Sequence, residues 1–280
     1  MNQTARAIIK IVKGARTSDG AGVRLTRIIG NSNMMDLDPF LLFDEFKSDN
    51  PDDYIGGFPD HPHRGFETVT YLIAGVVDHA DSAGNAGRLL PGGAQWMTAG
   101  RGLVHSELPK QKEGLLWGFQ LWVNLPADSK MVPPRYQDIT PEAIPRAQLP
   151  DGAVARVLAG QVFGVRGPVE GIVTIPLYVD ISLPPNTSIS VPVEDEKSAF
   201  VYMAEGEGEA GGTALAAGML GQLSNGDTVE LAAGNSGCRV FVVAAKPLNE
   251  PVARWGPFVM NTDEEIEQAI QDYRAGRIKD

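Results

Sequence analysis

Cysteine, histidine and basic residues are all scarce in this chain of 280 residues. The single cysteine, Cys238, excludes an internal disulfide bond and with it the class of small disulfide-stabilised secreted domains. Lys and Arg number 24 against 35 Asp and Glu, which gives a formal net charge of −11. This balance disfavours direct binding to nucleic acid or to an anionic membrane surface, because both require a basic patch.

Long apolar runs are lacking as well. No segment approaches the roughly 18 consecutive apolar residues that a membrane-spanning helix requires. The first residues lead into a short Ile/Val/Lys segment without the apolar core of a signal peptide. We therefore expect a cytoplasmic protein that is not associated with a membrane.

Glycine and proline, in contrast, are abundant, with 32 and 20 residues. They separate short runs of Val, Ile, Leu and aromatic residues, a pattern typical of many strands joined by turns. The sequence therefore predicts an all-β fold. The clearest strand candidates are residues 66–73, 118–124, 173–183, 198–203 and 238–244.

The C-terminal end departs from this pattern. Thr262 and Glu265 have the spacing of a capping box, and the apolar residues that follow them recur at helical spacing. Gly276 supplies a stop signal. One C-terminal α-helix is therefore expected.

A proline-rich stretch over residues 125–150 interrupts the strand pattern midway. We interpret it as the connection between two domains, 1–135 and 136–280. A faint internal similarity relates the two halves, but no histidine follows His105. A histidine-based site is therefore expected in the first domain alone.

Three of the four histidines are grouped. His61 and His63 form one H-x-H pair, and His105 is followed two residues later by Glu107. Residues i and i+2 of a strand point to the same face, so each pair would present two donor atoms together. Two such strands lining a barrel would bring three imidazoles and one carboxylate together, a donor set that suits Fe, Mn, Co, Ni, Cu or Zn. The fourth histidine, His79, lies in a polar, turn-like stretch, and we expect it to be solvated rather than a ligand.

The segments around these residues carry a longer pattern. Residues 56–71 (GGFPDHPHRGFETVTY) resemble the first cupin motif and, in detail, the pirin family. Residues 91–107 (PGGAQWMTAGRGLVHSE) are similar to the pirin form of the second motif, and residues 38–46 (DPFLLFDEF) match as well. The resemblance covers most of the chain. It implies a bicupin of two tandem antiparallel, jelly-roll-like β-barrels, with the metal held only by the N-terminal barrel.

The resemblance further implies a ligand set, with iron(II) as the metal. The implied ligands are His61, His63, His105 and Glu107. Glu67 is the alternative carboxylate, because many other cupins use a glutamate at this position and its parity with the H-x-H pair predicts an inward orientation. We favour Glu107, since pirins resemble one another in using the glutamate of the second motif. Glu67 is then expected to be an inward-facing supporting acid.

The activity that the resemblance implies is that of a quercetin 2,3-dioxygenase. A flavonol or a similar enol would bind through its deprotonated hydroxyl, O2 would add across the ring, and carbon monoxide would leave. Glu107 would accept the hydroxyl proton as the catalytic base. The alternative is an iron-binding, redox-sensing regulator that binds a protein partner, and a third hypothesis is a cupin isomerase or lyase that acts on a polar small molecule.

Further residues of the motifs have two interpretations each. Arg64 would orient a ligand or a substrate anion, or else pair with Asp60 at the surface. Three aromatic residues would line an apolar pocket or belong to the core of the barrel: Phe43, Phe46 and Trp96.

Overall fold

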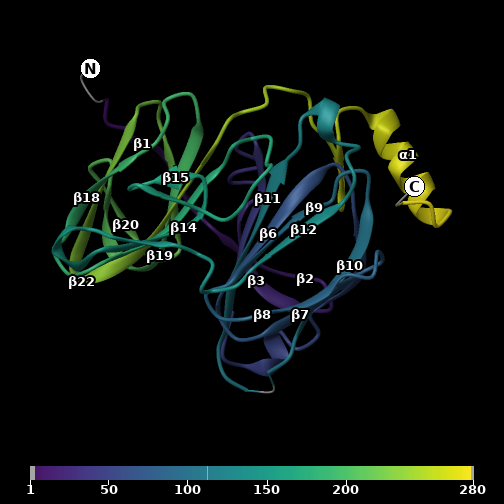
Figure 1. Cartoon of the computed structure of the whole chain (residues 1–280), viewed down its shortest axis with the longest axis horizontal. Helices are drawn as coiled ribbons and strands as arrows, with labels where there is room; N and C mark the ends of the chain where they lie inside the picture. Colours follow the sequence, from purple (N-terminus) through teal and green to yellow (C-terminus); the bar gives the residue numbers. More distant parts are fainter. Residues whose placement is uncertain (1–3, 112, 279–280) are drawn as a thin grey trace. The chain divides into compact units, whose positions relative to one another are not determined.

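The computed structural model describes residues 4–111 and 113–278. Its strands and helix are drawn in Figure 1. They fall into two compact units, and each unit is built from several segments of the chain. The first unit comprises Met1–Gly14, Ser32–Met34 and Glu142–Pro247, and the second comprises Ala15–Asn31, Met35–Pro141 and Leu248–Asp280.

The two units do not correspond to the first and second halves of the sequence, because each end of the chain belongs to the unit that is formed mainly by the other half. The first strand, β1 (Ile8–Lys13), pairs with β21 (Met219–Leu223) and so joins the unit of later residues. The C-terminal segment joins the unit of earlier residues. The predicted division into domains 1–135 and 136–280 therefore stays a prediction, and the compact units do not follow it at either terminus.

The second unit contains two antiparallel sheets. The seven-stranded sheet has the order β12-β9-β6-β11-β4-β3-β2, and the four-stranded sheet has the order β5-β10-β7-β8. Their strands are β2 (Ala15–Asp19), β3 (Val23–Ile29), β4 (Phe40–Ser48), β5 (Phe58–His63), β6 (Phe66–Ala74), β7 (Val77–Asp81), β8 (Ala86–Leu89), β9 (Ala94–Thr98), β10 (Leu103–Pro109), β11 (Leu116–Asn124) and β12 (Arg135–Ile139). Two short 3₁₀ helices, η1 (Pro51–Asp53) and η2 (Ala127–Ser129), lie between them in the chain.

The C-terminal segment of this unit forms a hairpin followed by a helix. Its elements are β23 (Ala253–Trp255), β24 (Phe258–Met260) and α1 (Asp263–Arg274). The predicted helix is confirmed, and its capping box forms between Thr262 and Glu265. Its apolar face buries Ile266 and Ala269 in a cluster with Phe258 of β24.

A buried arginine connects this segment to the barrel. Arg64 follows β5, and its Nη1 lies 2.8 Å from Oδ2 of Asp272 in α1. Its Nη2 donates to the carbonyl oxygen of Ile278, and its Nε donates to that of Arg101. Both predicted roles of Arg64 are therefore wrong, because its guanidinium binds Asp272 and two backbone carbonyls rather than a ligand or Asp60.

The first unit is a single nine-stranded antiparallel sheet with a two-stranded hairpin. The main path is β1-β21-β19-β22-β17-β14-β13, with β18 paired to β22 and β20 paired to β19. The remaining strands are β13 (Arg146–Gln148), β14 (Val154–Ala159), β15 (Gln161–Val162), β16 (Val165–Arg166), β17 (Leu177–Leu183), β18 (Ser188–Pro192), β19 (Ser198–Ala210), β20 (Thr213–Ala216) and β22 (Thr228–Ala245), with a 3₁₀ helix η3 (Pro150–Gly152). Its core is an aliphatic cluster that holds the side chains of Val179, Val201 and Val242.

The all-β prediction is confirmed, and each predicted strand overlaps an observed one: β6, β11, β17, β19 and β22. Two of them are much longer than predicted, because β19 continues through Gly206 and Gly208 and β22 begins ten residues before Cys238. In these stretches tertiary pairing overrides the low strand propensity of glycine.

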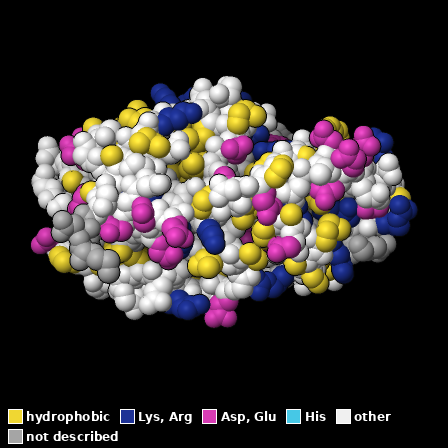
Figure 2. Space-filling view, turned by 90° about the horizontal axis from the view of Figure 1, so that it is seen from above, with side chains coloured by type: hydrophobic (Ala, Val, Ile, Leu, Met, Phe, Trp, Pro, Cys, Tyr) yellow, Lys and Arg dark blue, Asp and Glu magenta, His cyan; other side chains and the backbone are white. Residues whose placement is uncertain are grey.

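Charge on the surface is mixed. On the face drawn in Figure 2, Asp and Glu side chains are interspersed with single Lys and Arg side chains. Within the described residues, no helix is both long enough and apolar enough to cross a membrane.

Candidate metal centre

Three imidazoles converge between two neighbouring strands of the four-stranded sheet. His61 and His63 stand on β5, and His105 stands opposite them on the antiparallel strand β10. The ring centroids are 4.7 Å apart for His61 and His63, 4.4 Å for His61 and His105, and 5.0 Å for His63 and His105. One nitrogen from each ring can be chosen so that all three lie within 4.8 Å of one another.

Strand geometry accounts for this convergence. His61 and His63 are two residues apart and so share one face of β5, and the register places His105 directly across from His61. Imidazolium rings this close together would repel one another, so the arrangement disfavours their charged form.

The ring nitrogens at this point are short of partners. Nδ1 of His63 and both nitrogens of His105 are buried without a hydrogen bond to any residue in 4–111 or 113–278. Nδ1 of His61 lies 2.8 Å from the carbonyl oxygen of Pro59, which leaves its Nε2 facing away from that carbonyl. A buried polar atom without a partner is costly, and a metal ion is a partner that imidazole nitrogens accept.

Burial lowers the pKa of both inner histidines well below the usual value for histidine. For His63 the next causes are the neighbouring rings of His105 and His61, and for His105 they are His61 and His79. Both rings are therefore neutral near pH 7, which is the form that coordinates a metal.

Glu107 lies two residues beyond His105, and its side chain is directed to the seven-stranded sheet. Its Oε1 accepts a hydrogen bond of 2.7 Å from Oγ1 of Thr70 in β6. The group of donor atoms within 4.8 Å of one another consists of the three histidines, without this carboxylate. A bulge in the pairing of β10 with β5 falls between His105 and Glu107 and changes the register at this point.

Glu67 lies on β6, on the face of the seven-stranded sheet that is turned away from Glu107. Across from it in β9 is Thr98, whose hydroxyl donates to its Oε1 at 2.6 Å, whereas Thr70 belongs to the face that holds Glu107. The expected inward orientation of Glu67 is therefore wrong. Its parity with His61 and His63 is broken because the chain turns at Gly65, with φ of +90°, as it passes from one sheet to the other.

His79 is also placed differently from the prediction. It is buried in strand β7 rather than solvated in a turn, and it stands opposite Glu107 in the pairing of β7 with β10. Its Nε2 lies 3.2 Å from Oδ2 of Asp138, and its ring stacks on Tyr136 with centroids 5.9 Å apart. The polar residues on either side of it alternate with buried ones, which is a strand pattern rather than a turn pattern.

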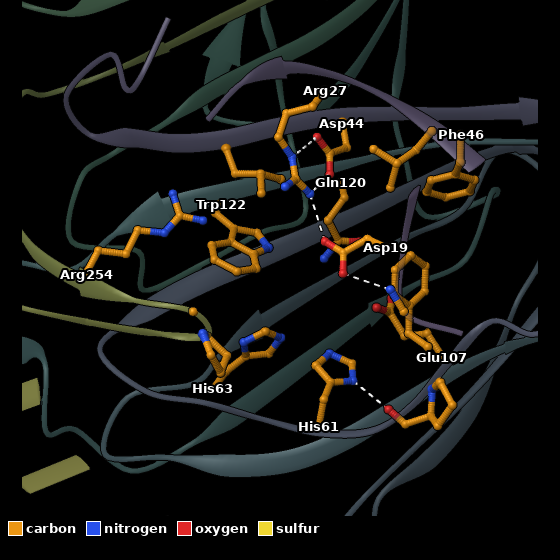
Figure 3. A pocket seen from close by; sticks show the side chains of 17 residues that line it. Asp19, Arg27, Asp44, Phe46, His61, His63, Glu107, Gln120, Trp122 and Arg254 are labelled. Atoms are coloured by element: carbon orange, nitrogen blue, oxygen red, sulfur yellow. Dashed lines mark hydrogen bonds and ion pairs between the residues drawn. The ribbon is translucent and has the colours of Figure 1, made fainter. Parts of the chain in front are cut away.

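A cavity of about 380 Å³ opens beside the histidines (Figure 3). His61, His63 and Glu107 line one side of it. The remaining wall combines apolar, polar and charged side chains from β2, β3, β4, β5, β11 and the C-terminal hairpin: Asp19, Leu25, Arg27, Leu42, Asp44, Phe46, Phe58, Gln120, Trp122 and Arg254.

The three aromatic residues singled out in the sequence divide between cavity and core. Phe46 lines the cavity. Phe43 is buried and stacks on Phe119 with ring centroids 5.7 Å apart, and Trp96 is buried in β9 on the same face of the sheet as Glu67.

Comparison with known proteins agrees with the resemblance seen in the motifs. A family model described as Pirin matches residues 22–123, and a model described as Pirin C-terminal cupin domain matches residues 178–279. Pirin from Homo sapiens is 42% identical over 277 residues, which cover 97% of this chain and 93% of that protein. The chain belongs to the pirin family.

Two further similarities concern relatives named as enzymes. A protein of Pseudomonas aeruginosa named "Putative quercetin 2,3-dioxygenase" is 48% identical over 279 residues, 97% of each chain. A crystal structure of quercetin 2,3-dioxygenase from Acinetobacter baumannii matches with a TM-score of 0.90 and 32% identity, covering 98% of this chain and 99% of that one. The fold predicted from the motifs, two cupin domains with a C-terminal helix, is confirmed.

Much of the cavity wall was missed by reasoning from the sequence. Trp122 is in edge contact with His63, with ring centroids 5.2 Å apart, yet it lies in a strand without any motif. Arg254 reaches the cavity from the C-terminal hairpin. Neither position carries a local signal, because the fold alone brings these residues to the pirin motifs.

Proposed function

We propose that this pirin is a metal-dependent dioxygenase that opens the ring of a flavonol or a similar enol. The convergence of three imidazoles, two of which have buried nitrogens without a hydrogen-bond partner among the described residues, beside a cavity of about 380 Å³ carries this proposal. The names of the relatives from Pseudomonas aeruginosa and Acinetobacter baumannii support the choice of reaction.

The donor set fits a divalent transition metal ion. His61, His63 and His105 would hold the ion, and Glu107 would complete the set as its carboxylate ligand. Iron(II) is our first choice of metal, and Mn, Co, Ni, Cu and Zn suit the same nitrogen and oxygen donors. When bound, such an ion supplies Lewis acidity that favours the enolate form of the substrate, and the redox-active ions among them also supply redox chemistry with O2.

The protein's own residues would bind the substrate and move one proton. The apolar side chains of Phe46, Phe58 and Trp122 would hold an aromatic ring and exclude water. The hydrogen bond from Thr70 orients the carboxylate of Glu107, which would accept the proton of the substrate's enol hydroxyl.

The overall reaction balances with dioxygen as the only co-substrate. Both oxygen atoms of O2 enter the ring-opened ester, and the carbon that carried the enol hydroxyl leaves as carbon monoxide. No external reductant is consumed, since the flavonol itself is oxidised.

Oxygen uptake tests the proposal directly. Metal-free protein would be loaded in turn with Fe(II), Mn, Co, Ni, Cu and Zn and mixed with quercetin, while O2 consumption and carbon monoxide release are recorded. We expect equal amounts of flavonol and O2 to disappear with at least one of the redox-active metals. Fully loaded protein that consumes no O2 would contradict the enzyme and favour the regulatory alternative, in which partner affinity follows the oxidation state of the metal.

A matched pair of variants identifies the carboxylate. Glu107→Gln should lower turnover by about 10²–10⁴-fold, the usual contribution of a positioned general base. Glu67→Gln changes another buried acid, on the face of the seven-stranded sheet that is turned away from Glu107, and should leave turnover within about twofold. Equal losses in the two variants would contradict the role of Glu107.

A further inference from the structure

Two arginines line the cavity, and their surroundings differ. Arg27 is paired: its Nε and Nη2 lie 3.0 and 2.7 Å from the carboxylate of Asp44, and Nη2 also lies 2.9 Å from Oδ2 of Asp19. Arg254 has no carboxylate oxygen within 4.0 Å in any part of the chain that the structure describes. Arg27 is therefore bound in ion pairs, whereas the carboxylates of Asp44, Asp36 and Asp19 act on Arg254 only from a longer distance.

The guanidinium of Arg254 is nevertheless held in place. Its central carbon lies over the indole of Trp122, 4.9 Å from the ring centroid, and its Nη1 donates to the carbonyl oxygen of Leu41 at 3.1 Å. A guanidinium has five N–H donors, so most of them stay available for a ligand. Burial is the largest influence on its pKa and lowers it, but an arginine stays charged.

The backbone that carries Arg254 is anchored to the barrel. The residue belongs to β23, whose hairpin partner β24 is buried. The amide of Val259 in β24 donates to the carbonyl oxygen of Arg64 at 3.0 Å, and the buried Lys130 donates to the carbonyl oxygen of Val259 at 3.1 Å. The hairpin therefore presents Arg254 from a supported element of the cavity wall.

The same indole connects Arg254 to the histidines. Trp122 has Arg254 over its ring and His63 at its edge, and Figure 3 shows it between the two. A volume of about 380 Å³ is near the low end of the roughly 300–1,000 Å³ of small-molecule sites, so a single compact aromatic ligand fills it. Such a ligand can face the histidines with one end and Arg254 with the other.

We propose that Arg254 determines specificity by binding an acidic substituent of the substrate, while the enol end of the same molecule faces the three histidines. The preferred substrate class is then a planar aromatic enol with a second anionic group, such as a carboxylate, which the guanidinium fork matches in a bidentate pair. The inference rests on the proposed function, because it names the substrate class of that cavity.

A pair of ligands that differ only in the acidic group tests this assignment. The full chain, loaded with redox-inert Zn(II), would be titrated with 3-hydroxyflavone and with 3-hydroxyflavone-4′-carboxylate, and binding would be followed by tryptophan fluorescence and calorimetry. We expect the carboxylate to bind about tenfold more tightly than the neutral parent, as a charge-assisted bidentate pair does. The preference should fall as the salt concentration rises.

Variants of Arg254 separate charge from geometry. Arg254→Gln should remove the preference for the carboxylate while it leaves the affinity for neutral 3-hydroxyflavone within about threefold. Arg254→Lys keeps the charge without the planar fork and should retain part of the preference. Arg146→Gln, which changes an exposed arginine of the other unit, is the control and should change neither affinity.

The outcomes distinguish this inference from the proposed function. A preference that is absent in the unchanged protein, or that persists in Arg254→Gln, overturns the role of Arg254 even if quercetin is turned over. A preference that depends on Arg254 while no metal-loaded form consumes O2 overturns the dioxygenase and retains the anion site. If neither flavone binds, both proposals are contradicted.

Discussion

The hydroxyl of Thr70 lies 2.7 Å from Oε1 of Glu107 and 2.8 Å from Oε1 of Gln120. A hydroxyl has one proton, so it can donate to only one of these oxygens at a time. The contact connects β6 of the seven-stranded sheet to β10 of the four-stranded sheet. The orientation of the carboxylate that we assign to the metal is thus set by a residue from the facing sheet, as is common around metal sites.

Loss of this hydroxyl should weaken metal binding. Thr70→Val keeps the shape of the side chain but leaves Glu107 without its donor, and residues that support a ligand in this way usually contribute 10–100-fold to metal affinity. We expect a loss of at least about tenfold, measured by competition with a chromophoric chelator. Thr98→Val, which removes the corresponding donor of Glu67 on the opposite face, should leave metal affinity unchanged. Equal losses in the two variants would point to a general effect on the sheet.

The histidines should differ sharply in their effect on metal content. His63→Ala and His105→Ala each remove one of the three converging nitrogens, so the loss in affinity should exceed the 10–100-fold typical of a supporting residue. His79→Gln removes the remaining imidazole while it keeps a donor for Asp138, and it should retain full stoichiometry. Elemental analysis of each purified variant measures its metal content, and its circular dichroism spectrum shows whether it is folded. Metal loss in His79→Gln with an intact fold would show that His79 is itself required for metal binding.

The sequence was sufficient to group the candidate ligands that lie close together in it. The H-x-H pair and the H-x-E pair each sit on one strand, and strand parity correctly placed His61 and His63 on a shared face. Parity failed for Glu67, because it holds only within one strand and the turn at Gly65 begins another.

Positions that depend on chain segments far apart were not predictable in this way. Arg254 and Trp122 meet only because the C-terminal hairpin returns to the barrel, a long-range pairing with no periodic signal in either segment. Polar residues gave the least information: Arg64 and His79 are buried because they find partners in distant elements, and burial of a charged residue cannot be foreseen without its partner.

Glu67 should make stability depend on pH. Burial raises its pKa from the ordinary 4.5 to about 7, against the hydrogen bond from Thr98 that lowers it. The folded protein therefore keeps this proton to a higher pH than the unfolded chain does, so the contribution is fully present below pH 4.5 and is lost as pH rises through 7. At 1.36 kcal/mol for each pKa unit, the loss is on the order of 3 kcal/mol.

Replacement of this carboxyl should remove that loss. Glu67→Gln keeps an acceptor for Thr98 but does not titrate, so its free energy of unfolding, measured by urea denaturation from pH 4 to 8, should fall less than that of the unchanged protein. Glu142→Gln, an exposed carboxyl, should leave the profile unchanged. Parallel profiles for Glu67→Gln and the unchanged protein would mean that Glu67 is ionised in the fold.

The ion pair of Arg64 with Asp272 should be a main determinant of how firmly the C-terminal segment is attached. Arg64→Met leaves a long apolar side chain in place of the buried guanidinium but removes the partner of Asp272 and the donors to two backbone carbonyls. Breaking a buried pair in this way costs about 3–5 kcal/mol. We expect urea unfolding to show that loss, and limited proteolysis to cleave near α1 faster than in the unchanged protein.

Arg277 supplies the matched control for this variant, because it contacts the same carboxylate from the surface. Its Nη2 lies 3.5 Å from Oδ1 of Asp272, and its side chain is 56% exposed against 3% for Arg64. Water screens such a pair, so Arg277→Gln should cost less than about 1 kcal/mol. Since the hairpin before α1 carries Arg254, Arg64→Met should also weaken the preference of the cavity for a carboxylate ligand, whereas Arg277→Gln should not. If Arg64→Met lowers stability but keeps the ligand preference, the hairpin holds its position without the helix, and the packing of β24 against the barrel alone positions Arg254.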